Sequence, residues 1–229
     1  MSQSYSNLVD ESHEHKELYS RREDLLNSGS HFLGLILSII GLIFMLVRSA
    51  SDGSATTVVA CTIFGATLIS MYGASGFYHY ATDKNIRKKL RTVDHLNIYF
   101  LIAGTYTPIA LIALNNVYGW LIFGIMWGLT AFGIIYKIFA FNASWVSTIL
   151  YVLMGWIALA FIVPIIEVLP LSCMMLVILG GVFYTTGVIF YMIDEVVEFS
   201  HFFWHIFVLF GSISHFFAIT IFLADLPVK

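Results

Sequence analysis

The sequence predicts an all-α integral membrane protein with seven transmembrane helices. Of its 229 residues, 59% are hydrophobic and only 11% are charged, whereas soluble domains carry about 25% charged residues. The mean hydropathy is +0.87, and the apolar residues form long runs separated by short polar connectors. These observations exclude a soluble globular fold, a disordered chain and a disulfide-rich scaffold.

The N-terminal region differs from the rest of the chain. Residues 1–22 are polar and carry charges of both signs, so we expect a solvated cytoplasmic tail followed by a seven-helix membrane domain over residues 23–229. His13 and His15 lie in this tail without further ligand residues, and we expect them to be solvated. The tail also lacks the basic-then-apolar layout of a cleavable signal.

Seven apolar segments account for the predicted spans. A helix that crosses a hydrocarbon core of about 30 Å needs about 20 apolar residues. The segments are residues 32–47, 56–80, 96–114, 117–138, 145–166, 171–193 and 201–223. The first is short, which leaves open a six-span arrangement in which it is buried or re-entrant. Pro108 and Pro164 lie inside spans, where each predicts a kink.

The basic residues predict the orientation. Nine of the eleven Lys and Arg residues fall on the N-terminal side of the alternating connectors, and only Arg48 and Lys229 fall on the other side. Because basic residues favour the cytoplasm, the N-terminus is expected inside, the C-terminus outside, and the protein in the cell membrane. The orientation alone accounts for the basic segment 84–91, which can in addition contact anionic lipid head groups. No nucleic-acid partner is expected. The sequence predicts neither a protein partner nor an oligomeric state.

Ionisable residues near the span ends are candidates for function, because such groups cost about 2.5 to 3.5 kcal/mol at the centre of a bilayer. Alternation of the spans brings most of them to one depth, at the cytoplasmic ends. The group comprises His31, His79, Asp94, His95, His201 and His205, with Asp194, Glu195 and Glu198 just before the last span. His215 lies deeper in the last span, where we expect it to pack and form a hydrogen bond.

Three of these histidines predict a zinc site. His201 and His205 are four residues apart and share one helix face, and His79 ends a predicted span at the same level. Three protein ligands and a water molecule are typical of a catalytic Zn²⁺. Two alternatives stay open: the imidazoles are ordinary interfacial polar groups, or His31 or His95 replaces one of the three ligands.

Ser75 and Asp94 are the predicted catalytic partners of this site. Ser75 precedes His79 by four residues and therefore lies one turn deeper on the same face. We expect Asp94 either to orient a ligating imidazole or to assist the water molecule at the metal, since metal-bound imidazoles usually need a carboxylate or carbonyl partner.

Four separated motifs resemble the bacterial haemolysin III proteins, which belong with the progestin and adipoQ receptor family. They are the residues Glu23, Asn27, Ser30 and His31; SGFYH at 75–79; DHLNIY at 94–99 with LIAGTYTP at 101–108; and HFFWH at 201–205 with the later GS and HF pairs. The resemblance covers about residue 20 to the end. Phe32 departs from it, since the bacterial members commonly have Gly after the His.

The resemblance implies a seven-helix fold with a cytoplasmic-side zinc held by His79, His201 and His205, and with Ser75 and Asp94 beside it. The similarity to adiponectin receptors and alkaline ceramidases implies zinc-dependent hydrolysis of lipid amides, whereas the haemolysin name implies cytolysis.

The sequence leaves three functions open. The first is a zinc hydrolase that cleaves an amide or ester of a membrane lipid entering sideways from the inner leaflet. The second is a receptor-like or membrane-homeostasis protein in which the zinc is a structural clasp. The third, a pore-forming cytolysin, is least favoured, because the first and fourth spans offer almost no polar stripe.

Overall fold

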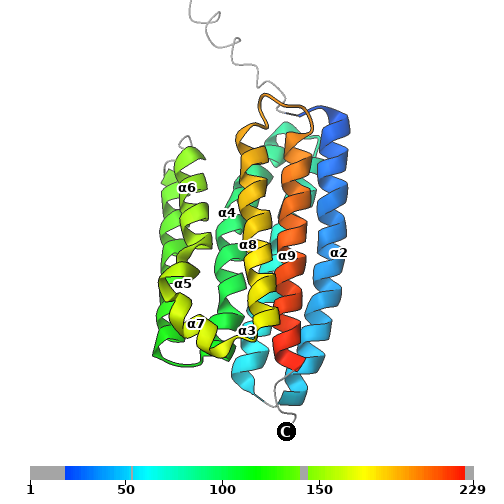
Figure 1. Ribbon diagram of the computed structural model, residues 1–229. Helices are drawn as coiled ribbons and strands as arrows, with labels where there is room; N and C mark the ends of the chain where they lie inside the picture. The colour runs from blue at the N-terminus through cyan, green and yellow to red at the C-terminus, as the bar shows by residue number, and fades with distance from the viewer. Residues whose placement is uncertain (1–18, 53, 140–143, 225–229) are drawn as a thin grey trace, which may run out of the picture.

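The structure, a computed structural model, describes residues 19–52, 54–139 and 144–224. Seven helical segments in this part of the chain are long and apolar enough to cross a membrane. Figure 1 shows them running roughly parallel in one elongated bundle. This confirms the predicted all-α membrane fold with seven spans. Of the predicted tail of residues 1–22, residues 1–18 lie outside the described residues, and His13 and His15 are among them.

The helices follow one another with short connections. Their bounds are α2 Arg21–Asp52, α3 Ala55–Tyr80, α4 Lys84–Pro108, α5 Val117–Phe139, α6 Ser144–Gly155, α7 Ile162–Val168, α8 Leu171–Met192 and α9 Ser200–Ala224. A π-helical turn, Ile109–Leu114, follows α4, and a 3₁₀ turn, Ile157–Phe161, separates α6 from α7. Figure 1 shows α5 and α6 standing with α7 to one side of the other helices.

The helix α2 begins much earlier than the predicted first span. It starts at Arg21, and its membrane-spanning part is Arg21–Ser51 rather than residues 32–47. The physical reason is that the polar residues of its first turns, including Asp24, Asn27 and His31, are buried inside the bundle. A hydropathy pattern does not distinguish such a buried polar face from a solvated tail. The first helix is therefore long enough to cross the membrane, and the six-span alternative is excluded.

The helix α4 likewise begins before its apolar run. The basic segment that was predicted as a connector forms the first turns of α4, which Asp83 caps by accepting hydrogen bonds from the backbone N–H groups of Asn85 and Ile86. Regular α-helix also stops at Pro108, and the 3₁₀ turn lies just before the helix that contains Pro164. Proline has no N–H to donate, so interruptions of the helical hydrogen-bond pattern are expected at these two places.

Close packing joins α2, α3, α4 and α9. In the α3–α4 contact, a Cβ on Gly104 would lie 2.0 Å from the hydroxyl oxygen of Thr67, so only glycine allows this approach. The ring of Phe32, the residue that departs from the bacterial pattern, lies over Gly76, where a Cβ would come within 2.7 Å of it. The missing side chain at position 76 thus accommodates the large one at position 32.

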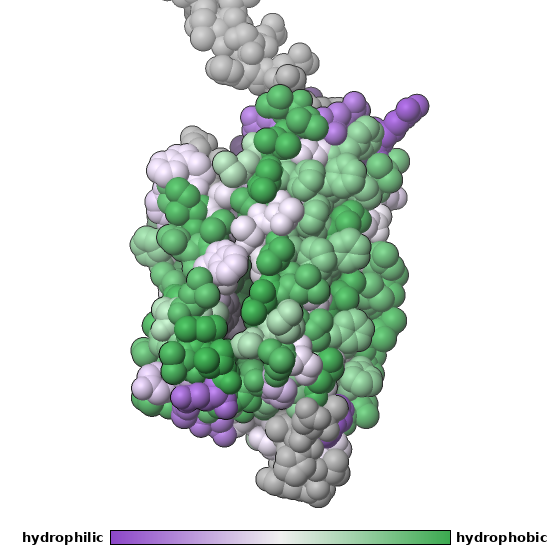
Figure 2. Space-filling model, in the orientation of Figure 1, coloured by the Kyte–Doolittle hydropathy of each residue, from purple (hydrophilic) through white to green (hydrophobic). Residues whose placement is uncertain are grey.

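The outer surface of the bundle is suited to lipid. Figure 2 shows a face that is mostly hydrophobic between its two ends, with hydrophilic residues gathered towards the ends. Large apolar side chains such as Ile40, Val47 and Ile138 are more than half exposed. The interior, in contrast, holds many of the polar groups. The N-terminal end of the bundle, where α2 and α9 begin and α3 ends, contains the site described next.

Candidate metal centre

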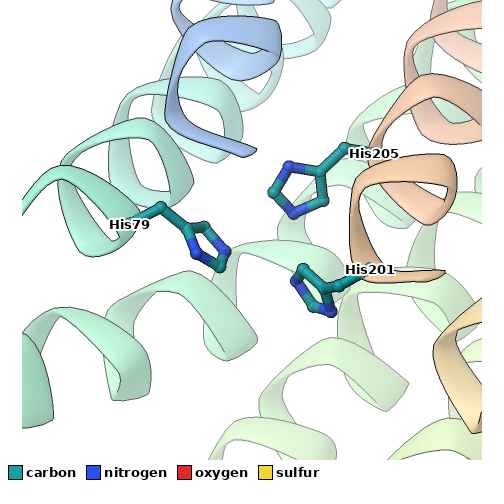
Figure 3. A group of neighbouring side chains, drawn as sticks. All are labelled: His79, His201 and His205. Atoms are coloured by element: carbon teal, nitrogen blue, oxygen red, sulfur yellow. The ribbon is translucent and has the colours of Figure 1, made fainter. Parts of the chain in front are cut away.

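Three imidazoles meet at the N-terminal end of the bundle. His79 comes from the last turn of α3, and His201 and His205 come from the first two turns of α9. One potential ligand atom of each lies within 4.8 Å of the others, and the three side chains are 0%, 6% and 1% exposed. Figure 3 shows the rings of the two helices gathered around one space. The structure thus brings together the three histidines that the sequence predicts.

Each of the three rings is held at its Nδ1 atom by an oxygen outside the group. His79 Nδ1 lies 3.0 Å from Asp24 Oδ1, and His201 Nδ1 lies 2.6 Å from Asp194 Oδ2. His205 Nδ1 lies 3.2 Å from the backbone carbonyl oxygen of Asn27. Carboxylate and carbonyl oxygens only accept, so Nδ1 is the donor in each pair and Nε2 keeps its lone pair. This is the arrangement of imidazoles that bind a metal through Nε2.

The first of these oxygens is itself fixed by a charged partner. Arg87 at the start of α4 donates to both oxygens of the Asp24 carboxylate, with distances of 2.8 Å from Nη2 to Oδ1 and 2.7 Å from Nη1 to Oδ2. Such two-point contacts are among the most directional in proteins. Helices α2, α3 and α4 are therefore joined through Asp24 of α2, which contacts both His79 of α3 and Arg87 of α4.

Tyr19 closes the site on the side of the N-terminal segment. Its ring centroid is 4.6 Å from that of His201 and 5.6 Å from that of His79. Its hydroxyl donates to Asp194 Oδ2 at 2.8 Å and lies 2.9 Å from His201 Nδ1. Burial, and next the neighbouring Asp194 carboxylate, raise the pKa of the Tyr19 phenol, so the hydroxyl keeps its proton at any physiological pH.

The two predicted catalytic partners are buried near this end of the bundle. Ser75 and Asp94 are 1% and 6% exposed, and the two side chains are neighbours. Among the described residues, Asp94 Oδ1 has no hydrogen-bond partner of regular geometry, and the same holds for Ser75 Oγ. No described hydrogen bond joins Asp94 to any of the three imidazoles. Its predicted role beside a bound water molecule stays a prediction.

The other histidines lie outside the three-membered group. His31 stacks on His205, and His95 contributes its backbone carbonyl oxygen to a hydrogen bond from the Tyr151 hydroxyl, 2.9 Å away. Neither is part of the cluster found among the described residues. His215 Nε2 lies 3.0 Å from the backbone oxygen of Val177, which confirms the packing and hydrogen bond that the sequence predicts for it.

Sequence reasoning missed the residues that orient the rings. Asp24, Asn27 and Tyr19 had no assigned part, and Asp194 was noted only as a nearby acid. A signal was nevertheless present, because Tyr19, Glu23, Asn27 and His31 recur every four residues. That spacing is typical of one helix face and argues against a solvated tail at this position.

The residue set fits Zn²⁺. Three imidazoles at this spacing, with their Nδ1 atoms already bonded, would provide three of the four ligands that zinc takes. His79 Nε2 in particular is buried and has no hydrogen-bond partner among the described residues, which is costly for a polar atom unless something binds it.

Comparison with known proteins identifies the family. Residues 19–216 match the family described as haemolysin-III related. The chain belongs to the haemolysin III family. It is 36% identical over 211 residues to the hemolysin-3 homolog of Bacillus subtilis (strain 168), a match that covers 92% of this chain and 99% of that protein. It is 38% identical over 200 residues to hemolysin-3 of Bacillus cereus, covering 86% of this chain and 90% of that protein.

A relative from animals extends the similarity beyond bacteria. The human monocyte to macrophage differentiation factor is 28% identical over 214 residues, which cover 86% of this chain and 83% of that protein. As a member of the haemolysin III family with seven apolar helices and bacterial relatives, the chain is a multi-pass protein of the plasma membrane.

Proposed function

We propose that this haemolysin III protein is a zinc-dependent hydrolase that cleaves an amide or ester bond of a membrane lipid. The observation that supports this most strongly is the set of three buried imidazoles whose Nδ1 atoms are all held from outside. A bound Zn²⁺ would supply Lewis acidity, which activates water and polarises a carbonyl group.

The number of ligands favours a catalytic site over a structural one. Structural zinc sites usually have four protein ligands, whereas catalytic sites have three and keep one position open. Among the described residues, the cluster contains three histidines and no fourth His, Cys, Asp or Glu. His31 is the nearest candidate for a fourth ligand, but its ring lies parallel to that of His205.

Ser75 and Asp94 have the chemistry that a hydrolase needs. The Asp94 carboxyl group, buried and next to Ser75, is suited to take a proton from an attacking water molecule and to pass it to the leaving group. The Ser75 hydroxyl, one turn from His79, is suited to donate a hydrogen bond to the oxygen that gains negative charge at the reacting carbonyl. Both side chains lie at the same end of the bundle as the imidazoles.

A lipid substrate is favoured by a cavity inside the bundle. The cavity lies between α3, α4, α6, α8 and α9 and is lined mainly by apolar residues. Its lining includes Trp204, the neighbour of His205 in the chain, and Gly155, Trp156 and Gly181 from the side of α6 and α8. An acyl chain matches this lining, whereas a charged, water-soluble substrate does not.

The decisive experiment is a turnover assay on the full-length, zinc-loaded protein with a total lipid extract. We expect release of a free fatty acid or amine that stops in His205→Ala and in Asp94→Asn. The two variants separate loss of metal from loss of chemistry, since only the first should lose zinc. Absence of any lipid product from the zinc-loaded protein would contradict the hydrolase.

A structural clasp is the second candidate function, and one observation favours it. The imidazoles and their partners connect α2, α3, α4 and α9 and the connector before α9, so a metal here would fix the N-terminal end of the bundle. A receptor-like or homeostatic protein could use such a clasp. Zinc that is present in stoichiometric amount, resists exchange and has four protein ligands by X-ray absorption would favour this function.

The names of the two bacterial relatives suggest cytolysis, which a separate assay addresses. Release of dye from protein-free lipid vesicles on addition of the purified protein would favour a pore. Retained dye together with lipid turnover would favour the hydrolase.

A further inference from the structure

One face of α2 carries polar residues into the interior of the bundle. Glu23, Asn27 and His31 follow one another at intervals of four residues and therefore share a face. Their side chains are 3%, 0% and 0% exposed. We call these three residues the α2 polar stripe. Polar groups buried in a membrane protein are costly unless hydrogen bonds satisfy them.

Five polar atoms of this stripe lack hydrogen bonds of regular geometry. Among the described residues, none provides such a partner for Glu23 Oε1, for either polar side-chain atom of Asn27, or for either ring nitrogen of His31. The two serines between them are satisfied, since Ser28 donates to the backbone oxygen of Gly76 and Ser30 to that of Asn27. Within the described part of α2, the unsatisfied atoms thus lie along one line. Buried polar atoms without protein partners are normally bonded to ordered water molecules.

The stripe has one end near the aqueous boundary and the other at the three imidazoles. At the outer end, Glu23 accepts a backbone hydrogen bond from Phe199 and faces the carboxylate of Glu198, both in the connector before α9. At the inner end, His31 stacks on His205 with ring centroids 3.6 Å apart. From Glu23 to His31 the helix rises about 12 Å. The line therefore runs from the N-terminal end of the bundle to the candidate metal centre.

The direct approach to the imidazoles is closed. Tyr19, itself 5% exposed, covers His79 and His201, and its hydroxyl is held by Asp194. The cavity between α3, α4, α6, α8 and α9 is lined mainly by apolar groups, and none of the three imidazoles is part of its lining. Hydrolysis of an amide or ester consumes one water molecule per bond broken, so a buried hydrolytic site needs a polar route for water.

We infer that the α2 polar stripe binds a file of ordered water molecules that connects the N-terminal end of the bundle to the three-histidine site. Glu23 offers acceptors, Asn27 offers both donors and an acceptor, and His31 offers one of each, so each residue can bond to a water molecule that also bonds to the next. The role of this file in supplying reactant water rests on the proposed function. The binding of water itself rests only on the buried polar atoms.

Hydroxyl-radical labelling in ¹⁸O-water tests this inference without any substrate. A brief X-ray pulse generates radicals from water molecules inside the full-length protein, and mass spectrometry locates the side chains that gain ¹⁸O. We expect strong labelling of His31 despite its 0% exposure, and only background labelling of Phe64, which is also 0% exposed but lies in the apolar core.

Two variants of one residue provide the matched comparison. Asn27→Leu keeps the branched shape and the number of heavy atoms but replaces both polar atoms with methyl groups, so labelling of His31 should fall to the Phe64 background. Asn27→Asp keeps polar atoms and should retain the labelling. Zinc content, measured in parallel, checks that the backbone carbonyl of Asn27 still holds His205 in both variants.

The outcomes separate this inference from the proposed function. Background labelling of His31 in the unaltered protein, or unchanged labelling in a folded Asn27→Leu protein, would overturn the water file even if lipid turnover is observed. Strong labelling that is lost in Asn27→Leu would support the file even if no lipid is hydrolysed, and in that case only the hydrolase would be contradicted.

Discussion

The imidazole ring of His31 lies flat on the imidazole ring of His205, with centroids 3.6 Å apart and ring planes only 11° from parallel. The carbonyl oxygen of Asn27, one helical turn before His31, holds the Nδ1 atom of the same His205. Helix α2 therefore fixes both the plane and the tautomer of one candidate ligand from α9. The first prediction concerns the stacking contact alone.

Two variants of His31 should show whether zinc binding depends on the flat ring of this residue or on its nitrogen atoms. His31→Phe keeps a flat ring against His205 and should retain stoichiometric zinc. His31→Ala removes the ring and frees His205 to rotate, so zinc affinity should fall by about 10- to 100-fold, the usual effect of a residue that orients a ligand. Competition with a fluorescent zinc chelator measures both affinities. Equal loss of zinc from the two variants would instead indicate that His31 binds the metal directly.

The three imidazoles should each be necessary for stoichiometric zinc. Alanine in place of His79, His201 or His205 removes one of the three imidazoles that form the cluster among the described residues, and we expect about one zinc per chain to be lost in each case. His215→Ala is the control, because its ring nitrogen contacts the backbone of Val177 elsewhere in the bundle. Metal analysis of purified proteins decides the matter. Full zinc occupancy in any of the three alanine variants would refute the ligand assignment.

The carboxylates behind the imidazoles should tune affinity without being ligands. Asp24→Asn and Asp194→Asn each weaken the acceptor at an Nδ1 atom, so zinc affinity should fall by about 10- to 100-fold while the bound metal keeps three nitrogen ligands. Glu195→Gln, an exposed neighbour of Asp194, should change nothing. Chelator competition together with X-ray absorption spectroscopy measures these effects. A change in ligand number would show that a carboxylate binds zinc directly.

The spans were largely predictable because a membrane imposes a simple rule on sequence. Six of the seven predicted apolar runs match candidate spans of the structure within a few residues. The one larger difference among these six is the start of α4, whose polar first turns precede the apolar run. For the first run, the predicted start at residue 32 was wrong, because the helix begins at Arg21. In α2 the polar residues Asp24 and Asn27 face inwards, and a hydropathy pattern assigns such residues to water when they lie near the end of a chain.

Part of the three-histidine cluster was predictable from local spacing, whereas the oxygen atoms that hold its Nδ1 atoms were not. The pairing of His201 with His205 follows from the four-residue period of a helix. The partner of His79 lies 55 residues away along the chain, and that of His205 lies 178 residues away. No spacing rule reaches so far, and the second partner is a backbone oxygen, which carries no side-chain signal. Only the packing of α2 against α3 and α9 reveals these contacts.

The orientation of the bundle stays a prediction that a reporter can test. Nine of the eleven basic residues lie on the side of the N-terminus, so the positive-inside rule places Lys229 outside. A reporter that is active only in the cytoplasm should be silent when it is fused after Lys229 and active when it is fused before Met1. Basic residues added to the connector at Asn115 and Asn116 should impair insertion. An active reporter at the C-terminus would show that the orientation is reversed.

Asp94 provides the sharpest separation between chemistry and metal binding. Its carboxyl group is buried beside Ser75 and forms no described hydrogen bond to the imidazoles, and its Oδ1 atom has no regular partner among the described residues. Asp94→Asn preserves the shape but removes the ability to take a proton. Zinc content should therefore stay at about one per chain, whereas lipid hydrolysis should fall by about 10²- to 10⁴-fold, the usual contribution of a general acid–base group.

Ser75→Ala is the companion measurement, because it removes a hydrogen-bond donor and leaves the carboxyl group intact. Its hydrolysis should fall by about 10²- to 10³-fold if the hydroxyl stabilises negative charge on the reacting oxygen, again with zinc retained. If Asp94→Asn instead loses its zinc, the carboxylate is a fourth ligand. The centre would then have the closed coordination of a structural clasp, and the hydrolase would lose its main support.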